Sequence, residues 1–305
     1  MNLINEINKL KKEKDVLILG HYYLDPKVQD IADYLGDSYG LAKKAMDCKE
    51  KIILFAGVVF MAETAKILNP SKKVLAVTMD AGCPMADMIN SNDIIAMREK
   101  YKNLYVVSYV NSTADVKTQS DICVTSRNAL DIVRDIPSKY KNILFVPDKN
   151  LGSYIIKKTD RNMILWDGFC CVHNDISADT IKKAKEKYKD SVIIVHPECN
   201  SKVVEKCDFA MSTSQMVDYA SKNTDKTIFV GTETGVLHSM KKYNSKVYSL
   251  SEKTICKNMK KNTLEEIYNT LDKEVNEIVL SNEVLKKAYI PIKRMIDYTE
   301  KRNSQ

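Results

Sequence analysis

The stretch Trp166-Asp167-Gly168-Phe169-Cys170-Cys171-Val172-His173 contains the middle member of an evenly spaced series of cysteines. Cys83 stands in Ala-Gly-Cys-Pro and Cys256 in Thr-Ile-Cys-Lys. The intervals from Cys83 to Cys170 and from Cys170 to Cys256 are 87 and 86 residues. Near-equal spacing of single cysteines along a whole chain predicts three copies of one structural unit, each of which delivers one thiolate to a shared point.

The repeat is also visible away from the cysteines. In each unit an apolar run is followed by Val, four residues, Asp, four residues, and then Ser or Thr. The three series are Val28/Asp33/Ser38, Val116/Asp121/Ser126 and Val203/Asp208/Thr213. A period this long indicates a domain duplication, because solenoid repeats are shorter. Coincidence among common residues is the alternative. It is disfavoured because four features keep the same phase in all three units: the first apolar run, the Val/Asp/Ser-or-Thr series, a second apolar run at 52–56, 142–146 or 227–230, and the cysteine.

The length of 305 residues predicts two or three small domains. We expect unit one at 1–88, unit two at 89–175 and unit three at 176–262, with the C-terminal helices at 263–305 packing on unit one. Short buried strands, at 16–20, 51–56, 74–77, 104–107, 142–146, 192–195 and 227–230, alternate with helical segments. This alternation predicts parallel α/β units.

Two helices are predicted with particular bounds. Pro26 is expected to open a helix that runs to about Leu35, because Pro is tolerated in a first turn. The last helix, 282–301, is expected to be interrupted at Pro291, which cannot donate a backbone hydrogen bond.

The composition limits the class of protein. No apolar run approaches the roughly 20 residues needed to cross a membrane, and the Lys-rich stretch 1–15 lacks the apolar core of a signal peptide. We therefore expect a cytoplasmic protein with no membrane partner. Eight cysteines without paired spacing are typical of reduced thiols or a metal site, not of a disulfide framework.

The net charge of +7 comes from Lys residues scattered through helical segments. Scattered Lys usually forms a solvated face, and the chain has no recognisable nucleic-acid motif, so we expect no nucleic-acid partner. A positive field would still favour small anionic substrates.

Polar side chains follow the first predicted strand of each unit, where parallel sheets bind ligands. These pairs are His21/Tyr23, Tyr109/Asn111 and His196/Glu198. Ser38, Ser126 and Thr213 lie at predicted helix N-caps, where a hydroxyl and free backbone N–H groups bind carboxylate or phosphate. Three such caps imply a polyanionic ligand.

Each of these features has an ordinary structural interpretation. A Ser or Thr before a helix is usually a simple cap, a buried Cys is usually inert packing, and a lone His is usually a satisfied polar residue. However, of four histidines, His21, His173 and His196 fall in the repeated motifs. The fourth, His238, is equally consistent with a structural role.

Three dispersed thiolates suit a [4Fe-4S] cluster in which one iron has no protein ligand. Structural zinc usually takes four ligands, mostly in close sequence pairs. An open iron can act as a Lewis acid on a hydroxyl or carboxylate. Electron transfer would require neither an open position nor anion-binding caps.

The chain resembles quinolinate synthase, the bacterial and archaeal enzyme of NAD biosynthesis, over nearly its whole length. The matching segments are 21–38, 60–68 (Phe-Met-Ala-Glu-Thr-Ala-Lys-Ile-Leu), 81–83, 109–111, 125–129, 147–152, 168–170, 196–199 and 259–265. So many motifs in the same order are highly specific.

The resemblance implies three homologous Rossmann-like, three-layer α/β units around a pseudo-threefold axis and a [4Fe-4S] cluster held by Cys83, Cys170 and Cys256. It also implies condensation of iminoaspartate with dihydroxyacetone phosphate to quinolinate, with loss of phosphate and water. An enzyme that produces iminoaspartate is then a candidate partner.

The matching motifs imply a substrate-binding set and a catalytic set. The substrate-binding residues are His21, Ser38, Tyr109, Val110, Asn111, Ser126, His196, Pro197, Glu198 and Thr213. Tyr23, His173 and Glu198 are the expected proton carriers or orienting groups, and His21, Tyr109 and His196 complete the catalytic set.

Two alternatives stay open. A non-enzymatic sensor of iron or oxygen would explain a cluster, but it would leave His21, Tyr23, Glu198 and the three caps without a role. A cluster-dependent hydro-lyase that acts on another hydroxy acid would use the same kinds of residue.

Overall fold

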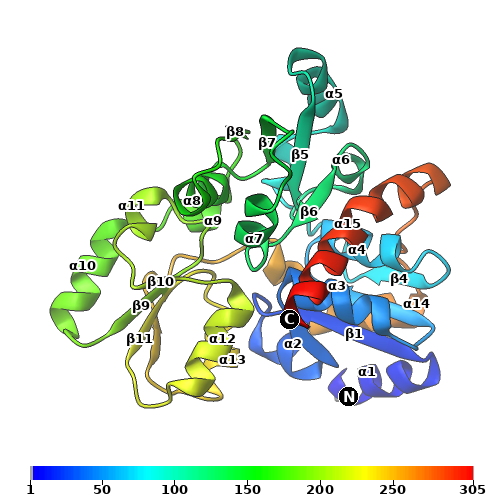
Figure 1. The fold of residues 1–305 in the computed structure, drawn as a ribbon. Coiled ribbons are helices and arrows are strands. Elements are labelled where there is room, and N and C mark those ends of the chain that lie inside the picture. Colours follow the sequence, from blue (N-terminus) through cyan, green and yellow to red (C-terminus); the bar gives the residue numbers. More distant parts are fainter. Residues whose placement is uncertain (1–2, 305) are drawn as a thin grey trace.

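The computed structural model describes residues 3–304 and contains three four-stranded sheets. Every strand pair in these sheets is parallel. The sheets occupy the blue, green and yellow parts of the chain and lie around a common centre (Figure 1). This arrangement confirms the predicted fold of three Rossmann-like α/β units.

The first sheet has the order β2-β1-β3-β4. Its strands are β1 (Val16–His21), β2 (Tyr34–Gly36), β3 (Ile52–Ala56) and β4 (Lys73–Ala76). The accompanying helices are α1 (Leu3–Glu13), α2 (Pro26–Ile31), α3 (Ser38–Asp47), α4 (Val59–Leu68) and the 3₁₀ helix η1 (Ala86–Met88). β1 and β3 are buried along their whole length, as expected for central parallel strands.

The second and third sheets repeat this plan, with orders β6-β5-β7-β8 and β10-β9-β11-β12. The second comprises β5 (Leu104–Tyr109), β6 (Ile122–Val124), β7 (Asn142–Val146) and β8 (Ile164–Leu165), with α5 (Ser91–Lys100), α6 (Ala114–Thr118), α7 (Ala129–Arg134), α8 (Lys149–Thr159) and α9 (Cys171–Asn174). The third comprises β9 (Val192–Val195), β10 (Phe209–Ala210), β11 (Ile228–Gly231) and β12 (Val247–Ser249), with α10 (Ala178–Lys187), α11 (Ser201–Val204), α12 (Thr213–Lys222), α13 (Val236–Lys241) and η2 (Met259–Lys261). Each unit therefore ends with a cysteine followed by a short helix.

The aspartate of the sequence repeat has one structural role in all three units. Its Oδ2 atom accepts a hydrogen bond from the N–H of the first strand, over 2.8 Å for Asp33 and Ile18, 2.7 Å for Asp121 and Val106, and 2.7 Å for Asp208 and Ile193. The N–H of each aspartate donates back to the carbonyl of the same strand residue. These two bonds begin the edge strand of each sheet, which is β2, β6 or β10.

The helix expected from Pro26 to about Leu35 is shorter than predicted. α2 ends at Ile31, and Tyr34–Gly36 form β2, which pairs with Leu19–His21 of β1. The prediction was wrong because the two hydrogen bonds of Asp33 to Ile18 align the next three residues with the sheet.

The last helix is not interrupted at Pro291. α15 (Asn282–Asn303) continues through this residue, and Ala288, Ile292, Met295 and Ile296 are buried on both sides of it. A proline inside a helix costs roughly 3 kcal/mol, and the burial of this apolar face offsets that cost. The predicted break was therefore wrong because tertiary packing was not visible in the sequence.

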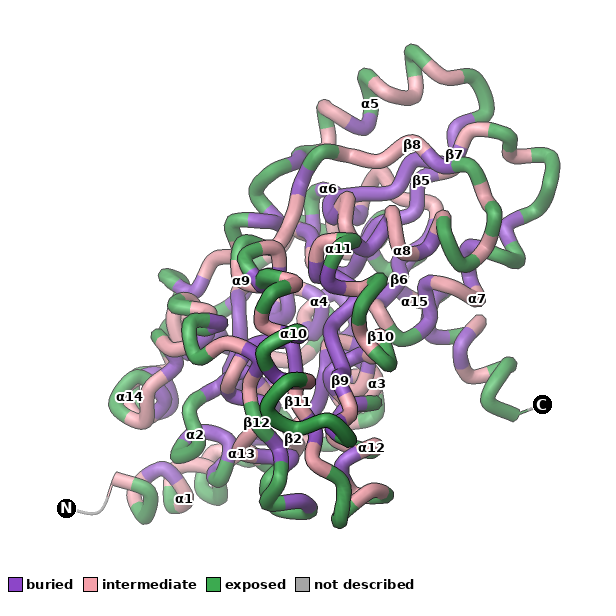
Figure 2. Tube along the Cα trace, turned by 90° about the vertical axis from the view of Figure 1, so that its left-hand side faces the viewer, coloured by how far each residue is buried: buried purple, intermediate pink, exposed green. Residues whose placement is uncertain are grey.

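The closing helices lie against two units. α14 (Leu264–Lys273) packs on α1 of the first unit, whereas α15 contacts α4 of the first unit and α6 and β6 of the second. One apolar core continues from β1 and β3 into β9 and β11. Buried residues follow the strands, while the outer helices carry the exposed ones (Figure 2). The unit boundaries at 88, 175 and 262 remain a prediction.

No helix within residues 3–304 has both the length and the apolar character that a membrane span requires.

The loop that carries Cys170 is closed by a tight backbone contact, which gives a first prediction. Gly168 forms a bridge with Asp148, and its carbonyl accepts from Lys149 N–H over 2.8 Å. A Cβ atom on Gly168 would lie 2.5 Å from the carbonyl oxygen of Pro147, whereas a Cβ atom on Gly82 would come no closer than 4.0 Å to the carboxylate of Asp87. We expect Gly168→Ala to lower the free energy of unfolding by about 1–3 kcal/mol.

The matched control is Gly82→Ala, which should change the free energy of unfolding by less than about 0.5 kcal/mol. Urea unfolding of the metal-free proteins measures both effects. Equal stability of the two variants would contradict the proposed tight contact at Gly168.

Candidate active site

One cavity lies where the three units meet and brings together most of the residues predicted from the sequence. It is lined by residues of all three units and is partly open to solvent. Thirteen predicted site residues line it: His21, Tyr23, Ser38, Cys83, Tyr109, Asn111, Ser126, Cys170, His173, His196, Glu198, Thr213 and Cys256. Val110 and Pro197 are buried and are chain neighbours of cavity residues, but they do not line the cavity themselves.

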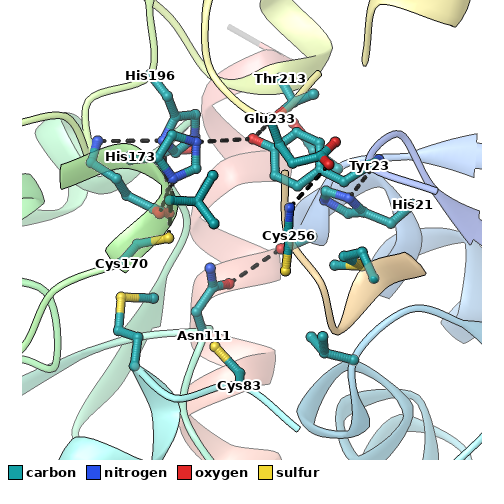
Figure 3. Close-up of a pocket in the computed structure, with 18 of the residues that line it drawn as sticks. His21, Tyr23, Cys83, Asn111, Cys170, His173, His196, Thr213, Glu233 and Cys256 are labelled. Carbon is teal, nitrogen blue, oxygen red and sulfur yellow. Dashed lines mark hydrogen bonds and ion pairs between the residues drawn. The ribbon is translucent and has the colours of Figure 1, made fainter. Parts of the chain in front are cut away.

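The three evenly spaced cysteines face this cavity from different units (Figure 3). Each stands just before a short helix, namely η1, α9 or η2. Burial raises the pKa of Cys83 to about 12 and raises the pKa values of Cys170 and Cys256. A metal bound here would therefore have to displace thiol protons. The neighbouring Cys171 is exposed and does not line the cavity.

A buried network joins the second and third units. His173 Nδ1 lies 2.9 Å from Glu198 Oε2 and 3.2 Å from Cys170 Sγ. Tyr109 donates its hydroxyl to Glu198 Oε1 over 2.5 Å. One ligand atom from each of Cys170, His173 and Glu198 lies within 4.8 Å of the others, so this group could hold a metal ion.

The carboxylate of Glu198 is the anionic centre of this network. Burial alone would oppose its ionisation, but His196, His173 and the Tyr109 hydroxyl outweigh burial, so the pKa of Glu198 lies below its usual range. An ionised Glu198 fixes the proton of His173 on Nδ1, which leaves Nε2 as an acceptor. The imidazoles of His173 and His196 stack, with their centroids 4.7 Å apart.

Tyr23 connects this network to the first unit. Its hydroxyl lies 2.7 Å from Thr232 Oγ1, 2.9 Å from Thr213 Oγ1 and 3.5 Å from His173 Nε2. Thr232 is in turn 2.9 Å from His173 Nε2. A proton can thus pass between Tyr23 and His173 either directly or through the Thr232 hydroxyl.

His21 and His196 are held in the same way in their units. The Nδ1 atom of each accepts the N–H of the residue two positions later, over 3.2 Å from Tyr23 and 3.3 Å from Glu198. Burial lowers the pKa of His21 to about 4 and that of His196 to about 3. Both imidazoles are therefore neutral near pH 7, with Nε2 left to donate a proton in a hydrogen bond.

The three predicted hydroxyl residues reach the cavity, but their assignment as N-caps was wrong. Asp37 is the N-cap of α3 and Ser212 that of α12, so Ser38 and Thr213 are the first helical residues. Ser126 lies in the turn before Asn128, the N-cap residue of α7. In each of the first two cases the preceding residue has the extended backbone and the capping side chain.

The sequence interpretation did not single out three polar residues of this region. Asp37 and Glu233 line the cavity, and Thr232 bonds to both Tyr23 and His173. Thr232 and Glu233 directly follow β11, so their position after a strand was the available signal. His238 lies elsewhere: its Nε2 atom is 2.8 Å from Asp30 Oδ1 of the first unit, which supports a structural role.

Comparison with known proteins extends the resemblance to nearly the whole chain. The family model described as quinolinate synthetase A protein matches residues 5–297. A quinolinate synthase of Sulfurihydrogenibium sp. (strain YO3AOP1) is 47% identical over 302 residues, which covers 96% of this chain and 97% of that protein. A quinolinate synthase of Clostridioides difficile (strain 630) is 44% identical over 290 residues, which covers 94% of this chain and 95% of the relative.

A third relative, a quinolinate synthase of Caldicellulosiruptor bescii, is 45% identical over 298 residues and is covered to 98%. Family model and relatives thus agree over nearly full length, and the chain belongs to the quinolinate synthetase A protein family.

Proposed function

We propose that this cavity is the active site of a quinolinate synthase, in which iminoaspartate and dihydroxyacetone phosphate condense to pyridine-2,3-dicarboxylate with loss of phosphate and water. The observation that carries the proposal is the meeting of three thiols and the Tyr109–Glu198–His173 network in one cavity. The names of the relatives support the same reaction class.

The donor set fits an iron–sulfur cluster. Three thiols, one from each unit, line a single cavity, and all eight cysteines of the chain are free. Cys83, Cys170 and Cys256 would hold a [4Fe-4S] cluster, which when bound supplies an open iron as a Lewis acid for a hydroxyl or carboxylate. Thiols that must stay reduced also suit the cytoplasm, where we propose that the enzyme acts.

The remaining residues divide between binding and proton transfer. The hydroxyls of Ser38, Ser126 and Thr213 can donate to the carboxylates of iminoaspartate, and neutral His21 and His196 can do so without adding positive charge. Glu198 would accept a proton during the dehydrations, while Tyr23 and His173 return or orient one. These hydroxyl and imidazole hydrogen-bond donors, gathered in one cavity, suit small anionic substrates.

The source of iminoaspartate bears on the partner of this enzyme. An imine is open to hydrolysis in water, so direct supply by the enzyme that produces it would protect the substrate. We therefore keep an iminoaspartate-producing enzyme as a proposed partner.

A direct assay tests the proposed function. The anaerobically reconstituted protein is incubated with an iminoaspartate-generating system and dihydroxyacetone phosphate, and quinolinate is measured by mass spectrometry. We expect quinolinate only when both substrates are present. A fully loaded protein that forms none, but dehydrates another hydroxy acid or only changes its spectrum with iron or oxygen, would favour the hydro-lyase or the sensor.

The assignment of the thiols predicts the behaviour of cysteine variants. Cys83→Ser, Cys170→Ser and Cys256→Ser should each lose the iron and the absorption at ~400 nm expected of thiolate-bound iron. Cys171→Ala is the matched control, because this neighbour of Cys170 is exposed. Iron loss in Cys171→Ala with retention in Cys170→Ser would reverse the assignment.

The proton-transfer role predicts a turnover defect at Glu198. Glu198→Gln should keep the iron but lower kcat by about 10²- to 10⁴-fold, the usual worth of a general acid or base. The control is Glu205→Gln, since Glu205 is exposed and pairs with Lys157 away from the cavity. Near-normal turnover of Glu198→Gln would assign the proton transfer to another group.

A further inference from the structure

A second buried glutamate, Glu233, lines the cavity from the third unit. Its side chain is completely buried. Oε1 accepts the N–H of Cys256 over 3.2 Å and is 3.1 Å from Lys260 Nζ, while Oε2 accepts the N–H of Gly235 over 2.6 Å. A buried carboxylate is costly unless it is paired and hydrogen-bonded. Both oxygens of Glu233 meet this condition, and one of their donors belongs to a thiol residue of the cavity.

Lys260 extends this contact into the first unit. Its Nζ atom donates to the carbonyl oxygen of Tyr23 over 2.6 Å and lies 3.8 Å from Asp25 Oδ1. The ammonium group therefore binds Glu233 on one side and the backbone of Tyr23 on the other. One ion pair connects the N–H of Cys256 to the C=O of Tyr23.

We call the contacts that Glu233 and Lys260 make with the backbone of Cys256 and Tyr23 the junction. The packing around the junction leaves it little room to rearrange. A Cβ atom on Gly235 would lie 2.8 Å from the carbonyl carbon of Tyr23 and 2.9 Å from the oxygen of Leu24. Gln29 Nε2 lies within hydrogen-bonding distance of the carbonyls of Tyr22, Leu24 and Gly235, at 3.0, 2.9 and 2.9 Å. The backbone at Tyr23 and Leu24 is thus packed directly against Gly235 of the third unit.

We propose that Glu233 and Lys260 are positioning residues whose single ion pair fixes both the loop of Cys256 and the loop of Tyr23. Metal retention and proton transfer then depend on the same buried contact, although neither residue needs to touch the substrate. The inference rests on the proposed roles of Cys256 and Tyr23 in quinolinate synthesis.

The alternative is a pair that only stabilises the fold. It predicts that variants lower the stability of the whole protein and affect the two loops no more than other regions. The positioning role predicts a local effect at both loops, including the Tyr23 loop, which Glu233 reaches only through Lys260.

The test uses Glu233→Gln in the reconstituted holoenzyme. An amide can accept only one of the two backbone N–H groups that the carboxylate accepts, and it removes the charge that pairs with Lys260. We expect iron release to a chelator to become about tenfold faster, the effect of roughly one lost charge-assisted hydrogen bond. Amide hydrogen exchange should rise in residues 254–258 and in residues 22–25.

Two controls separate a local from a global effect. Glu63→Gln also alters a partly buried glutamate that accepts a backbone N–H, but its donor is Ala114, over 2.8 Å, and not Cys256. It should leave iron release unchanged. Lys260→Arg should release iron more slowly than Lys260→Met, and the double variant Glu233→Gln/Lys260→Met should release iron no faster than the faster single variant.

Iron release at the wild-type rate in Glu233→Gln, or faster exchange in residues 254–258 without any change in residues 22–25, would overturn the proposal. These readouts require iron but no turnover. A wild-type protein that retains iron but forms no quinolinate would therefore refute the proposed reaction, while the junction could still be judged by iron release and exchange.

Discussion

The rest of the structure depends on one hydrogen bond that recurs in each unit, in which the carboxylate of Asp33, Asp121 or Asp208 accepts the N–H of a residue in the first strand. In each unit this aspartate also pairs with a cation on the helix that precedes the central strand, which is α1, α5 or α10; the pairs are Lys11–Asp33, Arg98–Asp121 and Lys185–Asp208. The double contact aligns helix, central strand and edge strand. The polar side chains of the cavity come from the ends of these central strands and from the start of the helix after the edge strand, as His21 and Ser38 do in the first unit.

The sequence contained enough information to predict the repeat, the central strands and most cavity residues. The even spacing of the cysteines arises because the three units share the same order of strands and helices. Buried apolar runs such as Val192–Val195 form strands with the predicted bounds. Edge strands such as Phe209–Ala210 were not predictable, because two residues show no periodicity and their pairing depends on the side chain of Asp208. The N-caps were predicted at Ser38 and Thr213, one residue after the true caps, because either of two adjacent polar residues could cap the helix.

The hydrogen bonds and ion pairs between units could not be predicted from the sequence either. Tyr109 and Glu198 are 89 positions apart, yet their oxygens lie 2.5 Å from each other. Thr232 and Glu233 were not singled out because their significance lies in contacts with Tyr23, His173, Cys256 and Lys260 across the cavity. A pattern within one unit can indicate that a side chain faces the centre, but it cannot indicate which group of another unit it meets.

The position of each cysteine at the end of its unit has a consequence for the biosynthesis of the protein. Cys83 and Cys170 leave the ribosome long before Cys256. Until Cys256 has been synthesised, the nascent chain therefore offers at most two of the three thiols of the shared cavity. A group that needs all three thiols could therefore be inserted only after the third unit has been synthesised.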